Sequence, residues 1–251
     1  MENTGNNLVF GIRAIAEAID AGKNFDKIFI KQGFTGELLN VLKNNKINFK
    51  SVPQSKLDKI TKKNHQGIIG FIAPIEYINF EELITQIFEK SEYPLMAVLD
   101  GITDVRNFGA IARSAEFMGI NAIIIPENNS VTVTPDAIKT SAGALLKLPV
   151  CKVKSIAVTL EKMKEYGMTI IGCTEKAGDN LYNTEINGPA AIVLGSEDIG
   201  LSRIVLKIAD KLIKIPGFGS VNSLNVSVAA GIFFYEIKKQ ISNSNNPKKL
   251  K

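Results

Sequence analysis

The sequence has few cysteines, no long apolar segment and no P-loop signature. Its two cysteines, Cys151 and Cys173, lack the close spacing of a metal site and are expected to be small core residues. No apolar stretch approaches the ~20 residues of a membrane-spanning helix, and the polar start MENTGNN lacks the apolar core of a secretory signal. We therefore expect a cytoplasmic protein with no disulfide, no metal and no membrane partner. Without a GxxxxGK[ST] run, a P-loop nucleotide site is not supported.

Positive charge is concentrated in the first third of the chain. Residues 1–73 hold 11 Lys and Arg against 6 Asp and Glu, whereas residues 74–251 hold 19 of each, so the first part carries the whole net charge of +5. Three of these cations, Lys56, Lys59 and Lys63, are expected to share one helical face. A localised positive excess favours a polyanion partner. A solvated lysine-rich surface would give the same count.

Alternating apolar runs and amphipathic segments predict an α/β protein with two domains. Residues 1–73 are expected to form a small α/β module that opens with a helix at Leu8–Gly22, and residues 74–94 are expected to be a linker. In residues 95–241, strands and helices alternate throughout, which predicts a parallel sheet. Residues 242–251 have no apolar surface to bury, so we expect a disordered basic tail there.

Two glycine-bearing loops follow apolar strands near the end of the second domain. The run Ala190–Leu194 predicts a buried strand that stops at the loop 195–200 (GSEDIG), and Leu212–Ile215 predicts a strand that stops at PGFG. Open parallel sheets hold ligands beyond the carboxyl ends of their strands, so the functional site is expected in these loops. The GFG run is not a dinucleotide fingerprint, because Asn222 stands where a third glycine would fall.

Three short motifs occur in order along the second domain. They are Asp104–Gly109 (DVRNFG) with Arg113 after it, Gly195–Ser202 (GSEDIGLS), and Ile215–Ser227 (IPGFGSVNSLNVS). Together they resemble the motifs of the SpoU family of S-adenosylmethionine-dependent RNA 2′-O-ribose methyltransferases, and the resemblance extends over nearly the whole chain. It implies S-adenosylmethionine as cofactor and a parallel-sheet catalytic domain with a deep trefoil knot. It also implies that the N-terminal module is an RNA-binding domain resembling ribosomal-protein folds.

The resemblance implies roles for individual residues, with Arg113, Asn107 and Glu197 as the catalytic set. A guanidinium is a poor base, so Arg113 is expected to grip a phosphate and favour the developing alkoxide. Asn107 is expected to orient Arg113 through a hydrogen bond, and Glu197 to pair with Arg113 or accept a proton. The expected donor contacts are Leu194, Gly195, Ile215, Gly217, Leu224 and Asn225. The expected RNA contacts are Arg13, Lys59, Lys63 and His65.

The predicted function is methyl transfer to the 2′-hydroxyl of a ribose in RNA, with a guanosine of 23S rRNA as the expected target. Three alternatives stay open: a tRNA guanosine 2′-O-methyltransferase, an rRNA adenosine methyltransferase that confers resistance, and a non-catalytic RNA-binding or ribosome-assembly factor. The predicted last helix, Leu224–Lys239, is apolar nearly all round and must be covered on most sides. Members of the family dimerise through this region, so a homodimer is expected.

Overall fold

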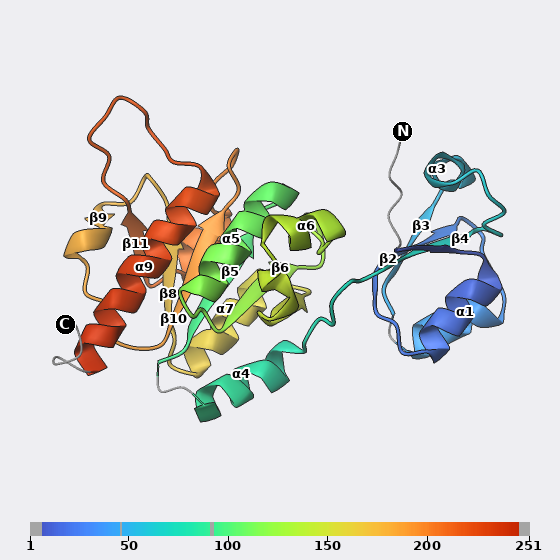
Figure 1. The fold of residues 1–251 in the computed structure, drawn as a ribbon, viewed down its shortest axis with the longest axis horizontal. Coiled ribbons are helices and arrows are strands. Elements are labelled where there is room, and N and C mark those ends of the chain that lie inside the picture. The colour runs from blue at the N-terminus through green and yellow to red at the C-terminus, as the bar shows by residue number, and fades with distance from the viewer. Residues whose placement is uncertain (1–6, 46, 91–92, 246–251) are drawn as a thin grey trace. The chain divides into compact units, whose positions relative to one another are not determined.

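The computed structural model describes residues 7–245 apart from 46, 91 and 92 (Figure 1). They form two compact units, one built mainly from the residues up to Glu76 and one from Tyr77 onward. The first unit contains β1 (Leu8–Phe10), α1 (Ile12–Asp20), β2 (Phe25–Lys31), α2 (Glu37–Asn44), β3 (Phe49–Val52), α3 (Gln54–Ile60) and β4 (Ile68–Ile72). From Tyr77 onward the elements are α4 (Phe80–Lys90), β5 (Leu95–Asp100), α5 (Val105–Phe117), β6 (Ala122–Pro126), α6 (Pro135–Thr140), the 3-10 helix η1 (Ala144–Leu146), β7 (Val150–Val153), α7 (Ile156–Glu165), β8 (Thr169–Cys173), β9 (Asp179–Asn180), the 3-10 helix η2 (Leu181–Asn183), β10 (Ala190–Gly195), α8 (Arg203–Ile208), β11 (Lys211–Lys214) and α9 (Val226–Asn245).

The first unit is a four-stranded sheet in the order β1-β4-β2-β3. Strand β4 is antiparallel to β1 and β2, and β3 is parallel to β2. Helices α1 and α2 bury Ile15 and Leu42 with one face of the sheet, and α3 buries Leu57 against Ile69 on the other. The expected helix at Leu8–Gly22 is wrong at its start, because the first three residues pair with β4 and Gly11, at φ 90°, separates this strand from α1.

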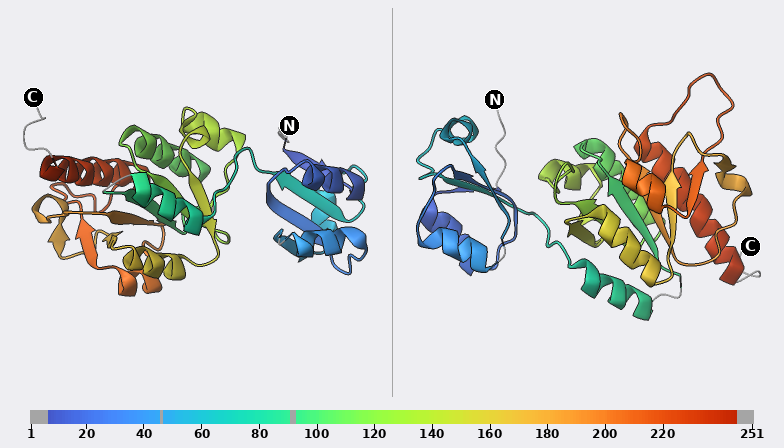
Figure 2. Two further views of the ribbon diagram at one scale, coloured as in Figure 1. Left: turned by 90° about the horizontal axis from the view of Figure 1, so that it is seen from below. Right: turned by 180° about the vertical axis from the view of Figure 1, so that it is seen from behind.

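The second unit is built on seven strands in the order β7-β6-β5-β10-β8-β11-β9. Every strand pair in it is parallel, so the predicted parallel sheet is confirmed. Strands β5, β10 and β8 lie in the middle and are buried on both faces, which is why they read as continuous apolar runs. Helices α5 and α9 lie side by side on one face, while α4, α7 and α8 cover the other (Figures 1 and 2).

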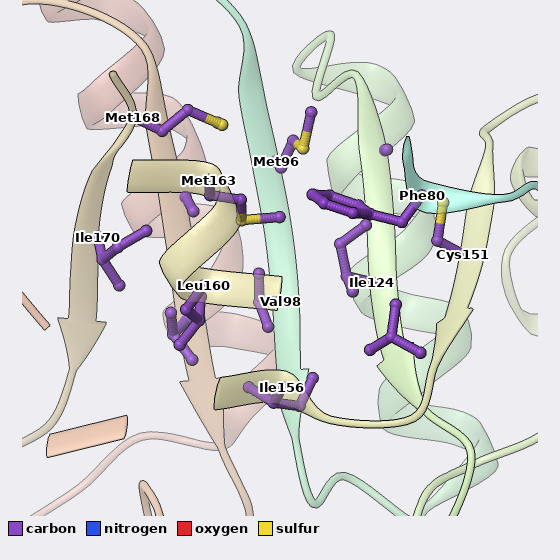
Figure 3. Packing of buried hydrophobic residues seen from close by; sticks show 14 of the residues in the cluster. Phe80, Met96, Val98, Ile124, Cys151, Ile156, Leu160, Met163, Met168 and Ile170 are labelled. Atoms are coloured by element: carbon purple, nitrogen blue, oxygen red, sulfur yellow. The ribbon is translucent and has the colours of Figure 1, made fainter. Parts of the chain in front are cut away.

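The main core fills the space between this sheet and α4, α7 and α8 (Figure 3). Met96 and Ile124 of the sheet meet Leu160 and Met163 of α7 there, and Phe80 of α4 packs against the same group. Helix α4 lies within the segment expected to be a linker, yet its apolar side chains recur at helical spacing and are buried. The helix is therefore a layer of the second unit.

Two helix boundaries bear on the site and on the expected tail. Helix α5 begins at Val105, inside the first sequence motif, because Asp104 caps it by accepting a 2.8 Å hydrogen bond from the Asn107 N–H. Helix α9 continues past the predicted end at Lys239 to Asn245, so the first four residues of the expected disordered tail are helical, and Ile241 just before them is buried. The rest of that tail lies outside the described residues. Across the described chain, no helix combines the length and apolarity needed to cross a membrane.

Candidate active site

The carboxyl ends of β8, β10 and β11 open into a cavity of about 820 Å³. Its walls are the loops that follow these strands, residues 173–176, 194–200 and 214–225, together with the first turns of α9. This volume suits a small-molecule ligand. All six residues expected to contact the methyl donor line the cavity: Leu194, Gly195, Ile215, Gly217, Leu224 and Asn225.

The loop after β10 approaches its own strand so closely that only glycine fits at position 195. A Cβ atom on Gly195 would lie 2.2 Å from the carbonyl carbon of Gly200. Backbone hydrogen bonds in both directions between Ser196 and Gly200, of 2.9 and 3.2 Å, close the loop. The segment 195–200 therefore forms a rigid rim on one side of the cavity.

The loop after β11 presents free backbone groups to the same cavity. Within the described chain, no hydrogen bond involves a backbone N–H or C=O of residues 217–224. Such groups must pair with water or with a ligand. Backbone donors and acceptors of this kind suit the polar edge of an adenine, and the apolar side chains of Leu194 and Leu224 suit its ring. The cavity therefore fits S-adenosylmethionine.

A single side-chain amide brings the three sequence motifs together. Asn225 Nδ2 donates to Glu197 Oε1 at 2.7 Å and to Asn107 Oδ1 at 3.1 Å. Asn225 Oδ1 accepts from the backbone N–H of Ser227 at 3.0 Å and from Ser227 Oγ at 2.6 Å, so the residue also caps α9. Loops after β5, β10 and β11 are thereby fixed to one another at the cavity.

A second contact ties the loop after β10 to β5. Asp100 ends β5 opposite Gly195 of β10, and its Oδ2 accepts a 2.7 Å hydrogen bond from the Ser202 N–H. Ser202 Oγ in turn accepts from the Val205 N–H and caps α8. Asp100 is thus a supporting residue that the sequence alone did not single out.

Arg113 does not lie in this cavity. It is six residues beyond Asn107 on α5, which places it about 9 Å further along the axis and about 240° around it. Its exposed side chain lines a smaller hollow of about 310 Å³ with Ser141 and Lys147. Among the described residues it has no hydrogen bond or ion pair. Within the described chain Arg113 therefore makes neither the expected hydrogen bond with Asn107 nor the expected pairing with Glu197, because it lines a different hollow. Asn225 bonds to both of these residues instead.

His65 is not exposed for an RNA contact. Its side chain is buried, with 7% of the residue accessible, and its Nδ1 accepts from the Gly67 N–H at 3.0 Å. Its Nε2 therefore carries the proton and donates to Asp58 Oδ1 at 2.9 Å. The ring fixes the turn before β4, so its predicted RNA contact is wrong.

The other three predicted RNA contacts are exposed. Arg13 forms a 2.8 Å ion pair with Glu17 one turn along α1, and Lys59 lies on α3. Lys63 lies beyond the end of α3, so it does not share a helical face with Lys56 and Lys59 as expected. Its Nζ is 5.8 Å from the centre of the Phe10 ring instead.

The end of β8 contributes two residues that the sequence did not assign to the site, and one of them, Cys173, is partly accessible at the cavity although it was expected in the core. Cys173 and Thr174 line the cavity because β8 lies directly beside β10 in the sheet. Burial raises the pKa of the Cys173 thiol well above its usual value, and burial raises that of Cys151 to about 12. The strand itself was predicted, but nothing in its sequence shows which strand lies next to it.

A parallel α/β sheet with a ligand cavity at its strand ends and a polar cluster on the rim defines an enzyme domain that acts on a bound small molecule. Residues 94–235 match the SpoU rRNA methylase family, and residues 8–78 match the substrate-binding domain of RNA 2′-O-ribose methyltransferases. The chain belongs to the SpoU family and is an RNA methyltransferase. The family uses S-adenosylmethionine as its methyl donor.

Similar proteins agree with this assignment. A relative from Staphylococcus aureus (strain MSSA476), which bears the name of a TrmH family tRNA/rRNA methyltransferase, is 39% identical over 94% of this chain and 96% of its own. The SpoU methyltransferase AviRb from Streptomyces viridochromogenes, solved with AdoMet, has a TM-score of 0.60 at 21% identity, over 93% of this chain and 89% of its own. The A. aeolicus TrmH/SpoU tRNA modifying enzyme has a TM-score of 0.56 at 27% identity, over 66% and 86%.

Proposed function

We propose that this chain transfers the methyl group of S-adenosylmethionine to the 2′-hydroxyl of a ribose in cytoplasmic RNA, with a guanosine of 23S rRNA as the target. The observation that carries the proposal is the Asn225 amide, which holds Asn107 and Glu197 at the rim of a cavity suited to the donor. A carboxylate fixed beside a donor cavity is what proton removal from a hydroxyl requires. An assembly factor that only binds RNA has no use for this arrangement.

Glu197 is the proposed proton acceptor. Asn225 holds one carboxylate oxygen, Oε1, and leaves Oε2 to face an incoming hydroxyl. When bound, S-adenosylmethionine supplies an electrophilic sulfonium methyl group. As the ribose oxygen takes that methyl group, the bond from the methyl carbon to sulfur would break, S-adenosylhomocysteine would leave, and the hydroxyl proton would pass to Glu197 Oε2. The loops 195–200 and 214–225 line the cavity and would hold the donor. The transfer requires the ribose oxygen to lie in line with the methyl–sulfur bond.

Arg113 is proposed to act in the cavity of a second copy of the chain. Its guanidinium is exposed and unpaired within the described chain, and it lines a different hollow from the donor residues. Phe117 lies one turn further along the same face of α5 and is 80% exposed. Close to it, α9 exposes Val228, Ile232 and Tyr235, which recur at helical spacing.

These exposed apolar side chains support a homodimer through α5 and α9. Isolated apolar residues on a surface need no explanation, but a row of them along two adjacent helices marks an association surface. The same association would carry Arg113 of each copy to the other copy's site. There its guanidinium would grip the phosphate of the target nucleotide with two hydrogen bonds and favour the developing alkoxide.

A deep trefoil knot is also proposed. The tight loop 195–200 and the long segment 214–225 line one cavity although a helix and a strand separate them in sequence. Helix α9 then returns against α5 and β10. This return past an earlier loop is the arrangement that a threaded chain requires.

The first unit is proposed to bind the RNA through the sheet face that carries α3, a surface resembling that of RNA-binding ribosomal proteins. Lys56 Nζ lies 5.2 Å from the centre of the Phe29 ring, and Lys63 Nζ lies 5.8 Å from that of Phe10. Lys59 is exposed on the same helix as Lys56. Cations next to aromatic rings attract both phosphates and bases.

The test uses the purified full chain, tritiated S-adenosylmethionine and total RNA from a strain that lacks the enzyme. The methylated ribose is located by its resistance to alkaline cleavage, and a Glu197→Gln variant is the matched control. Label at one 23S guanosine, lost in the control, is the expected result. Label in tRNA or at an rRNA adenosine would keep the chemistry and change the substrate. Absence of label despite donor binding would overturn the catalytic proposal in favour of an assembly factor.

A further inference from the structure

We infer that Phe218 is the stacking surface for the nucleobase of the nucleotide being methylated, an inference that rests on the proposed ribose methylation. Phe218 lies in the loop after β11, lines the donor cavity and is 93% exposed. It stands between Gly217 and Gly219. A Cβ atom on Gly219 would meet nothing within 4 Å, and one on Gly217 would meet only a backbone oxygen at 4.0 Å. Neither neighbour therefore adds a side chain beside the ring, which is itself open to solvent.

The exposure of this ring calls for a partner. Burying a phenylalanine side chain stabilises a fold, and this stabilisation is missing at Phe218, which is exposed. Val221, in the same loop, is 80% exposed, and Ile199, on the opposite rim of the cavity, is 78% exposed. Three large apolar side chains thus stand in solvent around one cavity. An exposed apolar group of this kind around a cleft is typical of a surface that something else covers.

The position of the ring selects the partner. The ribose hydroxyl must reach Glu197, and Glu197 and Phe218 line the same cavity. The base is attached to that ribose, so it arrives at the rim of the cavity together with it. A nucleotide that presents its 2′-hydroxyl to an enzyme must leave its stack on the neighbouring bases, and an aromatic face replaces the lost stacking. Stacking on a protein ring stabilises the base whatever its identity, because every base has a flat face.

The charges around the ring agree with a base more than with a phosphate. Glu197 and Asp198 line the cavity on the side of the loop after β10, and Lys214 lines it from β11. This mixture of signs gives no strong anion site. With no strong site for a phosphate, stacking of a base on the uncharged Phe218 ring is the interaction that the cavity offers. The flanking glycines let a base approach that face.

The chain has no tryptophan, so Phe218→Trp introduces a single fluorescent reporter that keeps an aromatic face. Val158→Trp, on α7 outside the cavity and 57% exposed, is the matched control. Total RNA from the strain lacking the enzyme is added to each variant with S-adenosylhomocysteine present. We expect the RNA to quench the emission of Phe218→Trp at least threefold more than that of Val158→Trp. Quenching by S-adenosylhomocysteine alone would overturn the inference by assigning the ring to the donor. Emission that changes on dilution without ligand would overturn it by assigning the ring to a second copy.

Steady-state kinetics give an independent readout. Phe218→Ala is expected to lower kcat/KM for RNA at least tenfold and to leave the KM for S-adenosylmethionine within twofold, while Phe218→Tyr restores the rate to within threefold. An RNA rate unchanged in Phe218→Ala, or one that Phe218→Tyr does not restore, would overturn the inference. A wild-type chain that labels no RNA would instead refute the proposed function, so the two failures are distinct.

Discussion

Asn225 Nδ2 lies 2.7 Å from Glu197 Oε1, a hydrogen bond between a residue that begins the last helix and a residue in the loop after β10. Among the described residues the Asn225 side chain makes four hydrogen bonds, and its oxygen and its nitrogen have separate roles. The oxygen caps α9 through Ser227, while the nitrogen positions Glu197 and Asn107. Aspartate preserves the first task and removes the second. Helix stability and catalysis therefore become separable at this one residue.

Asn225→Asp is expected to lower kcat at least tenfold, because it removes the donor and sets a second carboxylate against Glu197. Thermal stability should change little, since the capping oxygen remains. Asn225→Ala loses both tasks and should also lower the free energy of unfolding by about 1 kcal/mol. Methyl-transfer kinetics and thermal unfolding check the pair. Equal activity in Asn225→Asp and wild type would show that the hydrogen bonds from Asn225 Nδ2 to Glu197 and Asn107 are not needed for catalysis.

Arg113→Ala is expected to abolish methyl transfer, since its cation is needed at the ribose. If Arg113 acts in the site of a second copy, mixing inactive Arg113→Ala with the slower Asn225→Asp should raise the activity above that of either variant alone. Each mixed dimer then holds one site in which both residues are native. The measurement is methyl transfer after the two variants exchange subunits. Mixtures no more active than either variant alone, although mixed dimers form, would place Arg113 in the site of its own chain.

Tyr235→Glu is expected to convert the protein to a monomer, because it puts a charge into the apolar row on α9. Tyr182→Glu is a matched control, since Tyr182 is 57% exposed and Tyr235 is 58% exposed. Mass measurement by light scattering at micromolar concentration checks both variants. A wild-type chain that is already monomeric would remove the basis for this prediction and for the mixed-dimer site.

Cys173 reports on cavity occupancy. Burial raises its pKa well above the ordinary value, so little thiolate is present near neutral pH and iodoacetamide should react slowly. The rate should still rise with pH above the range in which an ordinary thiol, with a pKa of about 8.5, levels off. S-adenosylhomocysteine should slow the reaction, because Cys173 lines the cavity. Cys173→Ser is the control for labelling at Cys151, whose pKa of about 12 should keep it unreactive. Unchanged labelling with saturating ligand would place the donor elsewhere.

The lysines near α3 should set the salt dependence of RNA binding. Replacing Lys59 and Lys63 together by alanine is expected to weaken RNA binding and to lower the slope of log K against log salt by about 1–2, since each phosphate contact releases counterions. Lys43, an exposed lysine on α2, provides the control Lys43→Ala. Binding titrations at several salt concentrations measure both slopes. An equal slope in the double variant and the control would direct attention to another face of the first unit.

Local patterns were enough to predict most elements, because apolar periodicity is a local property of the sequence. The parallel sheet and the strands predicted at Ala190–Leu194 and Leu212–Ile215 follow from it. The boundaries that failed depend on tertiary contacts. Leu8–Phe10 is a strand because β4 lies beside it, and α9 runs on because Ile241 finds a place in the core.

The site could be predicted as a set of residues and not as an arrangement. The six expected donor residues line one cavity, since they stand in loops that share a sheet edge. The sequence could not show that the Asn225 side chain bonds to Asn107 and Glu197, because these hydrogen bonds join residues 118 and 28 positions apart. His65 shows the same limit, since its burial depends on the packing of Asp58 and the turn at Gly67.

The place of β10 in the sheet has a consequence for how the chain folds. Strand β10 lies between β5 and β8, both of which precede it in sequence. A central strand of the sheet is therefore synthesised after both of its neighbours. On a ribosome, β5 and β8 emerge first and have no neighbour on that side until Ala190–Gly195 appears. Pairing across so long a stretch of chain is intrinsically slow. Nascent chains should therefore expose the unpaired edge of β5 while residues 101–189 are made, and that of β8 only while residues 174–189 are made. Chaperone dependence should fall sharply once residue 195 has left the exit tunnel.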